Sequence, residues 1–398
     1  MDKEINNIVY FVSSSLNLGG AEIQSVELAN ELSEKGFEVR FYSLKYDNIL
    51  RNYISKNVNL REFKIYSTKT KEKPTLGTVY WWLKAISQLR NEIKQDYKSN
   101  QNISVISFMY HSWVTGFFAT LFFKDVKNII AVRSSKIASR GKNTKFLRFF
   151  VYIFVANLSD FVVFNSHFSF KKLGKYIIRN KRVYINNLLV KSKSSYNPDI
   201  NEKIFSRKSK FNIVSVGRLD KLKNYPQSIK AISLLIQEKI DVKLFIFGIG
   251  EEYLELKNLA EDLGIDENIV FMDRVEEPFL YFEHFDLLLQ TSKHESFPNS
   301  IVEALCKDLY VVSTDVGDVQ ILLESNRGHM LEGDNSKIIA ETLKKALFDR
   351  KSKTTQGKEF IDNYLNNIET VNEWEKLILL WKNIQSTWAT KKVWNLTS

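Results

Sequence analysis

The stretch NIVYFVSSSLNLGGAEIQSVELANELSEKGFEVRFYSL, residues Asn7–Leu44, predicts the fold class of this chain. Its opening, Asn7–Ser13, is a short β-branched and aromatic run bounded by polar residues, which is typical of a buried strand. A loop with two glycines follows, then a helical pattern over Ala21–Lys35, with Gly36 suited to the position just past a helix. A second strand is expected over Glu38–Leu44. This order predicts parallel strands joined by a crossover helix.

The same alternation continues along both halves of the chain. In the first half we expect further strands at Ile103–Phe108, Asn128–Arg133, Asp160–Asn165 and Arg182–Asn186. In the second half we expect strands at Phe211–Val216, Asp241–Phe247, Asn268–Met272, Phe285–Gln290 and Leu309–Ser313, with helices at Gln227–Glu238 and Glu251–Leu263. The pattern therefore predicts an α/β protein with two Rossmann-like, doubly wound domains that face each other across a cleft. Ligands of such sheets bind beyond the carboxyl ends of the strands.

The domain boundaries follow from polarity. Residues 1–190 are expected to form the N-terminal domain, the polar stretch 191–210 a linker, and residues 211–374 the C-terminal domain. Trp374, Trp381 and Trp388 recur every seven residues and mark one face of a helix over about 375–398. We expect this helix to pack back on the N-terminal domain.

The composition supports a two-domain globular enzyme or binding protein. The chain has 398 residues, 44% of them hydrophobic and 26% charged, enough to bury two cores. Its single cysteine, Cys306, excludes a disulfide framework and a multi-cysteine zinc site, and suits a reducing cytoplasm. The acidic start is unlike a signal peptide, and no apolar run is long enough to span a bilayer.

Charge is distributed unevenly along the chain. Residues 1–200 carry 31 Lys and Arg against 15 Asp and Glu, a balance of +16, whereas the remainder carries 26 against 31, a balance of −5. A basic half of this kind could face nucleic acid, an anionic membrane or a phosphorylated substrate. Within residues 136–154, KIASRGKNTKFLRFFVYIF interleaves cations with aromatic residues. We expect this segment to attach the protein to an anionic bilayer; alternatively, its aromatic residues belong to the core and its lysines only solubilise it.

Polar residues and glycines follow several of the expected strands. In SVGRLDKLKN, Ser215–Asn224, Arg218 and Lys223 would emerge at the carboxyl end of a strand, where two cations can stabilise a leaving diphosphate. Gly248, in IFGIGEE, permits either close approach of a ligand or a tight turn. Gly20 in LNLGGAE lies where a helix begins, which suits a phosphate or a sugar, although the loop lacks the dinucleotide fingerprint.

The segment HESFPNSIVEAL carries a pair of carboxylates around a helix start. Glu295 is expected in the loop and Glu303 about one turn into the helix. The backbone N–H groups of Asn299 and Ser300 at that start can bind a phosphate or a sugar hydroxyl. Carboxylates suit sugar recognition because each accepts two hydroxyl hydrogen bonds.

Taken in order, these motifs resemble a known family. GGAE, VGRLxxxK, G-x-G-E and E-x7-E followed by VVSTDVG are similar to the family-four (group 1) retaining glycosyltransferases of the GT-B fold. SFMYHSWVTGFF and AVRSSK in the first half resemble bacterial members that build cell-surface polysaccharides. The resemblance implies that Arg218 and Lys223 hold the donor diphosphate, that Glu303 holds the ribose hydroxyls, and that Glu295 contacts the transferred sugar. It also implies donor contacts for Gly20, Gly248, Arg274, Asn299 and Ser300, an acceptor contact for Arg133, and a sugar or acceptor contact in catalysis for His111.

The implied reaction is the transfer of a sugar from a nucleotide-diphosphate donor to a hydroxyl of a saccharide acceptor, which we expect to be lipid-linked. The resemblance implies front-face attack with retained configuration. We expect no metal and no cofactor, because the other histidines show no metal-ligand spacing. The expected location is cytoplasmic, at the inner face of the membrane. A nucleotide-sugar epimerase of GT-B shape remains an alternative, as does, less favoured, a basic nucleic-acid-binding protein.

Overall fold

The computed structural model divides the chain into two compact units. Unit 1 comprises residues 1–191 and 365–398, and unit 2 comprises residues 192–364. The structure describes residues 7–17, 19–45, 49–63, 76–99, 101–134, 142–190, 192, 196–348 and 356–380, without the side chains of 76–79, 142–145 and 147. Some residues used in the sequence prediction are not covered. The side chains of Lys142 and Lys145 lie outside the described part of the structure, and Trp381 and Trp388 lie outside it altogether.

Unit 1 contains a parallel sheet of seven strands. They are β1 (Asn7–Ser13), β2 (Glu38–Ser43), β3 (Asn59–Glu62), β4 (Asn102–Phe108), β5 (Lys127–Val132), β6 (Phe161–Phe164) and β7 (Arg182–Tyr184). Their order in the sheet is β3-β2-β1-β4-β5-β6-β7. The sequence pattern predicted all of them except β3, whose residues NLRE form a short, mostly polar run at the sheet edge.

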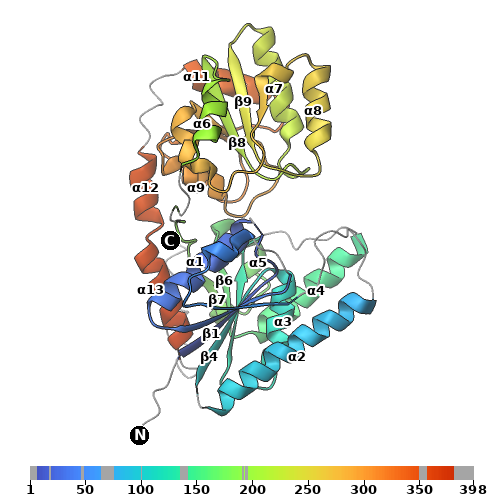
Figure 1. The fold of residues 1–398 in the computed structure, drawn as a ribbon, viewed down its shortest axis with the longest axis vertical. Helices are drawn as coiled ribbons and strands as arrows, with labels where there is room; N and C mark the ends of the chain where they lie inside the picture. Colours follow the sequence, from blue (N-terminus) through green and yellow to red (C-terminus); the bar gives the residue numbers. More distant parts are fainter. Residues whose placement is uncertain are drawn as a thin grey trace. The chain divides into compact units, whose positions relative to one another are not determined.

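Alternation along β1 explains how helices come to cover both faces of this sheet. Val9 and Phe11 face one core, whereas Ile8, Tyr10 and Val12 face the other. The first core is closed by α1 (Gly20–Glu34) and α13 (Asn367–Leu379), and the second by α2 (Leu76–Lys98) and α3 (Tyr110–Thr120) (Figure 1). Around β5 and β6 the second face is covered by α3 and α4 (Lys142–Leu158), while α5 (His167–Gly174) precedes β7. Two 3₁₀ turns, η1 (Ile49–Tyr53) and η2 (Arg179–Lys181), complete the unit.

Unit 2 repeats this topology with six parallel strands. They are β8 (Phe211–Val216), β9 (Val242–Phe247), β10 (Ile269–Phe271), β11 (Leu287–Gln290), β12 (Tyr310–Thr314) and β13 (Gly328–Leu331), in the order β10-β9-β8-β11-β12-β13. The last strand was not predicted, because GHML carries no β-branched residue. The helices are α6 (Pro198–Phe205), α7 (Tyr225–Gln237), α8 (Tyr253–Asp262), α9 (Asn299–Leu305), α10 (Val319–Leu323), α11 (Ser336–Phe348) and α12 (Gly357–Tyr364), with 3₁₀ turns η3 (Asp266–Asn268) and η4 (Pro278–His284).

Two segments differ in detail from the sequence expectation. The stretch expected to be a linker contains α6, which begins at Pro198 after the Asn197 side chain caps it, and which buries Ile204. The chain passes from unit 2 to unit 1 at Leu365, so α13 belongs to unit 1 although it follows unit 2 in sequence. Trp374 of α13 is 1% exposed in the core beside α1.

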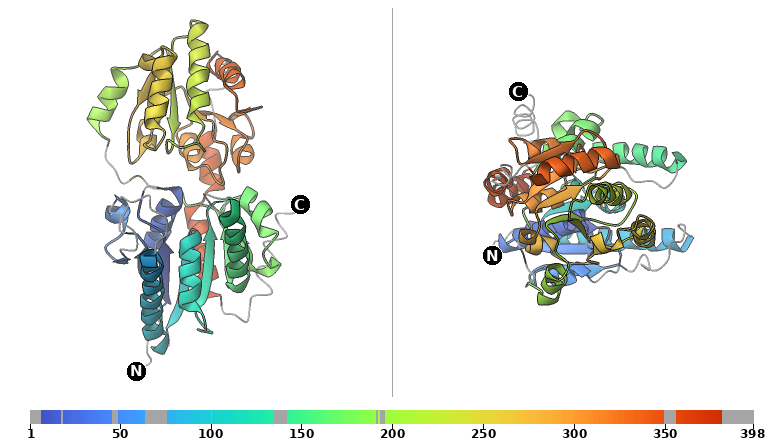
Figure 2. Two further views of the ribbon diagram at one scale, coloured as in Figure 1. Left: turned by 90° about the vertical axis from the view of Figure 1, so that its right-hand side faces the viewer. Right: turned by 90° about the horizontal axis from the view of Figure 1, so that it is seen from above.

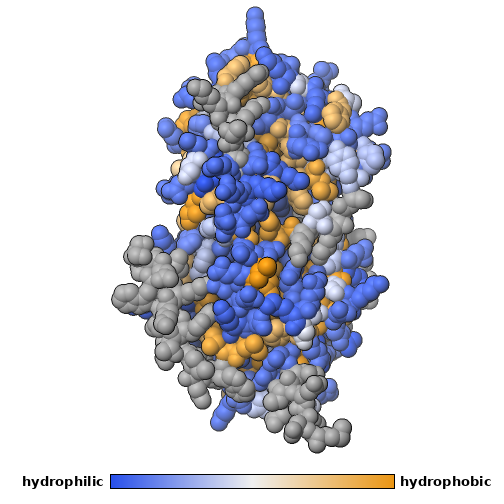
Figure 3. Space-filling model, turned by 90° about the vertical axis from the view of Figure 1, so that its left-hand side faces the viewer, coloured by the Kyte–Doolittle hydropathy of each residue, from blue (hydrophilic) through white to orange (hydrophobic). Residues whose placement is uncertain are grey.

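The two sheets share one feature that locates binding sites. In each, the chain first builds outward on one side of the first strand and then returns to the other side, so the switch points lie at β1/β4 and at β8/β11. Figures 1 and 2 show helices packed around each sheet. Open α/β sheets bind ligands at the carboxyl ends of the strands beside such a point. The face seen in Figure 3 is largely hydrophilic, with separate hydrophobic patches among the polar residues.

Candidate functional site

Two glycine loops meet at the carboxyl ends of β8 and β9. A Cβ atom on Gly248 would lie 1.9 Å from the carbonyl oxygen of Gly217, and one on Gly250 would lie 2.2 Å from that of Leu219. The Gly217 N–H donates to the carbonyl of Phe247 at 3.0 Å, which ties the loops together. Glycine is therefore required at Gly248 by the packing of one loop on the other.

The β8 and β11 loops are joined by an ion pair. The Lys223 ammonium lies 2.6 Å from Oε1 of Glu295, with 23% and 17% of the two side chains exposed. Two hydrogen bonds hold the loops together: the Lys293 N–H donates to the carbonyl of Leu222 at 2.7 Å, and the Thr291 hydroxyl donates to the carbonyl of Lys223 at 3.0 Å. Lys223 and Glu295, expected from the sequence to contact the diphosphate and the sugar, thus form one ion pair at the switch point of this sheet.

Helix α9 presents a carboxyl group with an unusual pKa. The helix begins at Asn299, its Ser300 hydroxyl donates to Oε1 of Gln290 at 2.9 Å, and Glu303 lies one turn further on. Desolvation, followed by the charge of Glu277, raises the pKa of Glu303 to about 8. Sequence reasoning missed Glu277, a buried carboxylate that accepts a hydrogen bond from the Ser192 hydroxyl at 2.5 Å. Its segment, VEEPF, carries no pattern that could have revealed it.

The remaining sequence-predicted residues of unit 2 are solvent-accessible. Arg218 follows β8 and Arg274 follows β10, and both side chains are exposed. Because β10, β9, β8 and β11 are neighbours, their loops leave the same edge of the sheet. That edge combines three basic side chains, one of which is already paired to the Glu295 carboxylate, with glycine backbone. This combination suits an anionic ligand with a polar extension.

Unit 1 carries its own group of polar residues at the β1/β4 switch point. Gly20 is the first residue of α1 and His111 the second of α3. The hydroxyls of Ser14 and Ser112 lie 3.2 Å apart beside them. Although solvent reaches the His111 ring, desolvation by the surrounding protein, followed by the charges of Arg148 and Lys45, lowers its pKa below the usual range. The imidazole is therefore neutral near pH 7, able to donate or accept a hydrogen bond.

Comparison with known proteins matches each unit to a family. Residues 197–361 match the family described as glycosyl transferases group 1, and residues 18–187 match glycosyltransferase family 4. The chain belongs to the group 1 glycosyltransferases. The resemblance inferred from its motifs is thereby confirmed, as is its nature as a sugar-transferring enzyme.

Two relatives of this glycosyltransferase carry undecaprenol-linked saccharides in their names. It is 26% identical over 94% of its length, and 99% of the relative's, to the Campylobacter jejuni GalNAc-alpha-(1->4)-GalNAc-alpha-(1->3)-diNAcBac-PP-undecaprenol alpha-1,4-N-acetyl-D-galactosaminyltransferase. It is 34% identical, over 36% of its length and 39% of the relative's, to a second C. jejuni N-acetylgalactosaminyltransferase, whose named acceptor is also a diphospho-undecaprenol saccharide. The crystal structure of Anabaena HepE with UDP and glucose superposes with a TM-score of 0.74 at 18% identity, covering 94% and 99% of the two chains. That superposition confirms the predicted GT-B fold.

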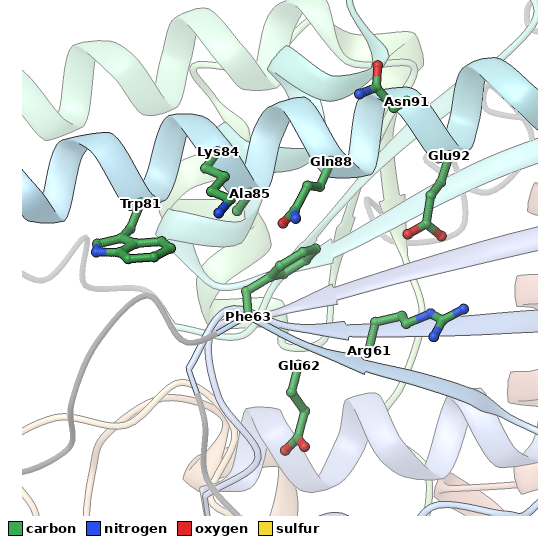
Figure 4. A pocket seen from close by; sticks show the side chains of 9 residues that line it. All are labelled: Arg61, Glu62, Phe63, Trp81, Lys84, Ala85, Gln88, Asn91 and Glu92. Atoms are coloured by element: carbon green, nitrogen blue, oxygen red, sulfur yellow. The ribbon is translucent and has the colours of Figure 1, made fainter.

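The glycosyltransferase also has a pocket that sequence reasoning did not anticipate. It has a volume of about 520 Å³ and lies between the end of β3 and α2, lined among others by Phe63, Trp81, Lys84 and Gln88 (Figure 4). The Lys84 ammonium lies over the Trp81 ring, 4.9 Å from its centroid. Since β3 is the edge strand, this pocket lies two strands away from β1 and so outside the β1/β4 switch point.

Two negative findings apply to the described residues of the glycosyltransferase. Among them, no helix is long and apolar enough to cross a bilayer. Nor does the described part of the chain bring together three His, Cys, Asp or Glu side chains that could hold a metal ion.

Proposed function

We propose that this glycosyltransferase moves a sugar, with retention of configuration, from a nucleotide-diphosphate donor to a hydroxyl of a lipid-linked saccharide during surface polysaccharide synthesis. The observation that carries the proposal is the Lys223–Glu295 pair at the β8/β11 switch point, with the exposed Arg218 on the same loop as Lys223. The names of the C. jejuni relatives support a lipid-linked acceptor, and the UDP and glucose bound to HepE support a nucleotide-sugar donor.

The donor would bind to unit 2 through complementary charge. Arg218 and Lys223 would bind the diphosphate and stabilise the charge that develops on its oxygens as the glycosidic bond breaks. Glu295, held by Lys223, would accept hydrogen bonds from hydroxyls of the transferred sugar, so the pair would couple the sugar's position to that of the diphosphate. Glu303 would accept from the ribose hydroxyls, with Asn299 and Ser300 at the start of the same helix and Arg274 toward the base.

Catalysis would then rest on positioning and electrostatics. In front-face attack, a donor phosphate oxygen takes the proton of the incoming hydroxyl as the sugar–phosphate bond breaks, so a protein base is unnecessary. We expect this without a metal ion, because Arg218 and Lys223 would supply the positive charge that the diphosphate needs. The acceptor would bind to unit 1, where the neutral His111 could accept a hydrogen bond from a sugar hydroxyl.

Helix α4 supplies a surface suited to an anionic membrane. Four side chains spaced four residues apart form one exposed apolar stripe: Phe146, Phe150, Phe154 and Leu158, which are 68%, 53%, 59% and 55% exposed. Phe149, on the adjacent face, contacts the Tyr176 ring, over which the Lys175 ammonium lies at 5.0 Å. Exposed aromatic residues bordered by cations favour the interface of an anionic bilayer over water. We therefore propose peripheral attachment through α4 at the cytoplasmic face.

A donor panel tests the proposed reaction directly. Incubating the full chain with UDP-, GDP- and dTDP-sugars should reveal one nucleotide class that raises the melting temperature and is slowly hydrolysed to free sugar and nucleoside diphosphate. An epimerase would instead convert the sugar while it remains attached to the nucleotide. Absence of both binding and hydrolysis with every donor would refute the proposal.

A further inference from the structure

Two of the three nitrogen atoms of the Arg133 guanidinium are buried without a hydrogen-bond partner among the described residues. Arg133 comes directly after β5, and its Nε and Nη1 atoms are shielded from solvent. Among the residues that the structure describes, no group accepts a hydrogen bond from either atom. The guanidinium instead lies over the ring of Phe108, at 5.2 Å, and that of Trp374, at 5.9 Å. Both rings belong to unit 1, so a strand end and α13 hold the group in place.

This arrangement is energetically unfavourable as it stands. Burying a cation costs more than cation–π contacts return, unless hydrogen bonds or a counter-charge satisfy it. Desolvation by burial lowers the pKa of Arg133 to about 9. A buried polar group without a partner is rare in folded proteins and needs an explanation, and a ligand that binds there is one.

Another stacked arginine of unit 1 shows the usual solution. Arg90 lies over the ring of Phe123 at 4.8 Å, as Arg133 lies over Phe108. Its Nη1, however, donates to the carbonyls of Ala119 and Leu121, at 3.2 and 2.6 Å. Stacking on an aromatic ring therefore does not by itself leave an arginine unsatisfied in this fold.

The surroundings of Arg133 favour an anion. Strand β5 pairs with β4, so Arg133 lies next to the carboxyl end of β4 and hence beside the β1/β4 switch point. At that end Met109 has φ of +70°, a conformation that residues other than glycine rarely adopt and that clusters at functional sites. The charges of Arg148 and Lys45 both act on His111 at the same edge. One carboxylate also lies at this edge: Glu22, in the first turn of α1, accepts a hydrogen bond from the Ser15 hydroxyl at 3.4 Å.

We propose that Arg133 anchors an oxyanion of the acceptor, a phosphate, diphosphate or carboxylate group, and so selects acidic over neutral acceptors. The proposal rests on the proposed function, which assigns the acceptor to unit 1. A planar guanidinium matches the oxygen spacing of such groups and donates to two oxygens at once. Phe108 and Trp374 preset its orientation, so binding the anion requires little ordering of the side chain.

The test is thermal unfolding of the full chain with three anions: inorganic phosphate, inorganic diphosphate and malonate. The parent for this test is Arg218→Ala/Lys223→Ala, which removes the proposed donor-diphosphate site. We expect at least one anion to raise the melting temperature of the parent and to have no effect once Arg133→Met is added. Without anions, Arg133→Met should melt at or above its parent, because it removes a buried charge but keeps the stacking bulk. The responding anion separates phosphate from carboxylate recognition.

Two further variants keep the result interpretable. Arg90→Met, the matched control, should melt lower than the parent, since it loses two hydrogen bonds, yet keep the anion response. Arg133→Lys should retain a weakened response, because it keeps the charge but not the planar fork. The proposal is overturned if no anion stabilises the parent, or if Arg133→Met melts lower and responds equally. Donor hydrolysis tests the proposed function separately. If no donor is bound or hydrolysed, the proposed function is refuted, while the anion response still decides the role of Arg133.

Discussion

The Lys223–Glu295 pair offers a sharp test of the site in the free enzyme. Its 2.6 Å contact is a charge-assisted hydrogen bond, but 23% and 17% of the side chains remain exposed, so solvent screens part of the attraction. Charged hydrogen bonds contribute about 1.5–3 kcal/mol when well shielded, and exposed pairs about 0.2–1. A double-mutant cycle with Lys223→Ala, Glu295→Ala and the double variant, followed by urea unfolding, should therefore give a coupling energy of about 1 kcal/mol.

The matched control for this cycle is Lys257–Glu261, an i,i+4 pair on α8. It is 3.7 Å apart and 54% and 51% exposed, so its coupling should stay below about 0.5 kcal/mol. Equal coupling energies for the two pairs would show that the Lys223–Glu295 contact is an ordinary surface interaction. The Lys223–Glu295 pair would then not be held in place in the free enzyme for donor binding.

Binding and turnover should separate the two partners. Lys223→Ala loses a cation and leaves the Glu295 carboxylate beside the diphosphate, so calorimetric affinity for free nucleoside diphosphate should fall about ten- to hundred-fold. Glu295→Ala releases Lys223 and should keep that affinity within a few-fold or raise it, while sugar transfer is lost. If Glu295→Ala, still folded, no longer binds nucleotide, its assignment to the sugar is refuted.

Three further predictions concern other residues. Arg218→Ala should lower turnover far more than melting temperature, because its side chain is exposed; equal losses of the two would mark a structural role. Glu303 has its pKa raised from 4.5 to about 8, so the fold favours the protonated carboxyl, and stability should be lost as pH rises from about 5 to 8. The melting temperature of Glu303→Gln minus that of wild type should therefore be larger at pH 8 than at pH 5, and the variant should lose nucleotide affinity. A difference in melting temperature that does not change with pH contradicts this. The double variant Phe150→Glu/Phe154→Glu should no longer co-sediment with anionic liposomes at low salt, whereas the control Ile368→Glu, exposed on α13, should still do so. If the α4 changes leave co-sedimentation unaffected, α4 is not the membrane-binding surface.

The fold class of this protein could be predicted from local pattern because parallel strands buried on both faces are continuous apolar runs. Asn7–Ser13 and Phe211–Val216 were predicted with the bounds that the structure shows. Strands β3 and β13 were missed because NLRE and GHML owe their conformation to pairing with a neighbouring strand. Tertiary pairing overrides weak local preference in such edge strands.

Motif order likewise indicated which loops matter, but it could not show how their side chains meet. The ion pair of Lys223 with Glu295 joins residues 72 positions apart, and the pKa of Glu303 depends on Glu277, which no motif marks. The guanidinium of Arg133 lies over the Trp374 ring only because α13 returns from the end of the chain to unit 1. Local preferences are encoded residue by residue, whereas desolvation and charge pairing depend on which distant groups the fold brings within a few ångströms, and so only the tertiary structure decides them.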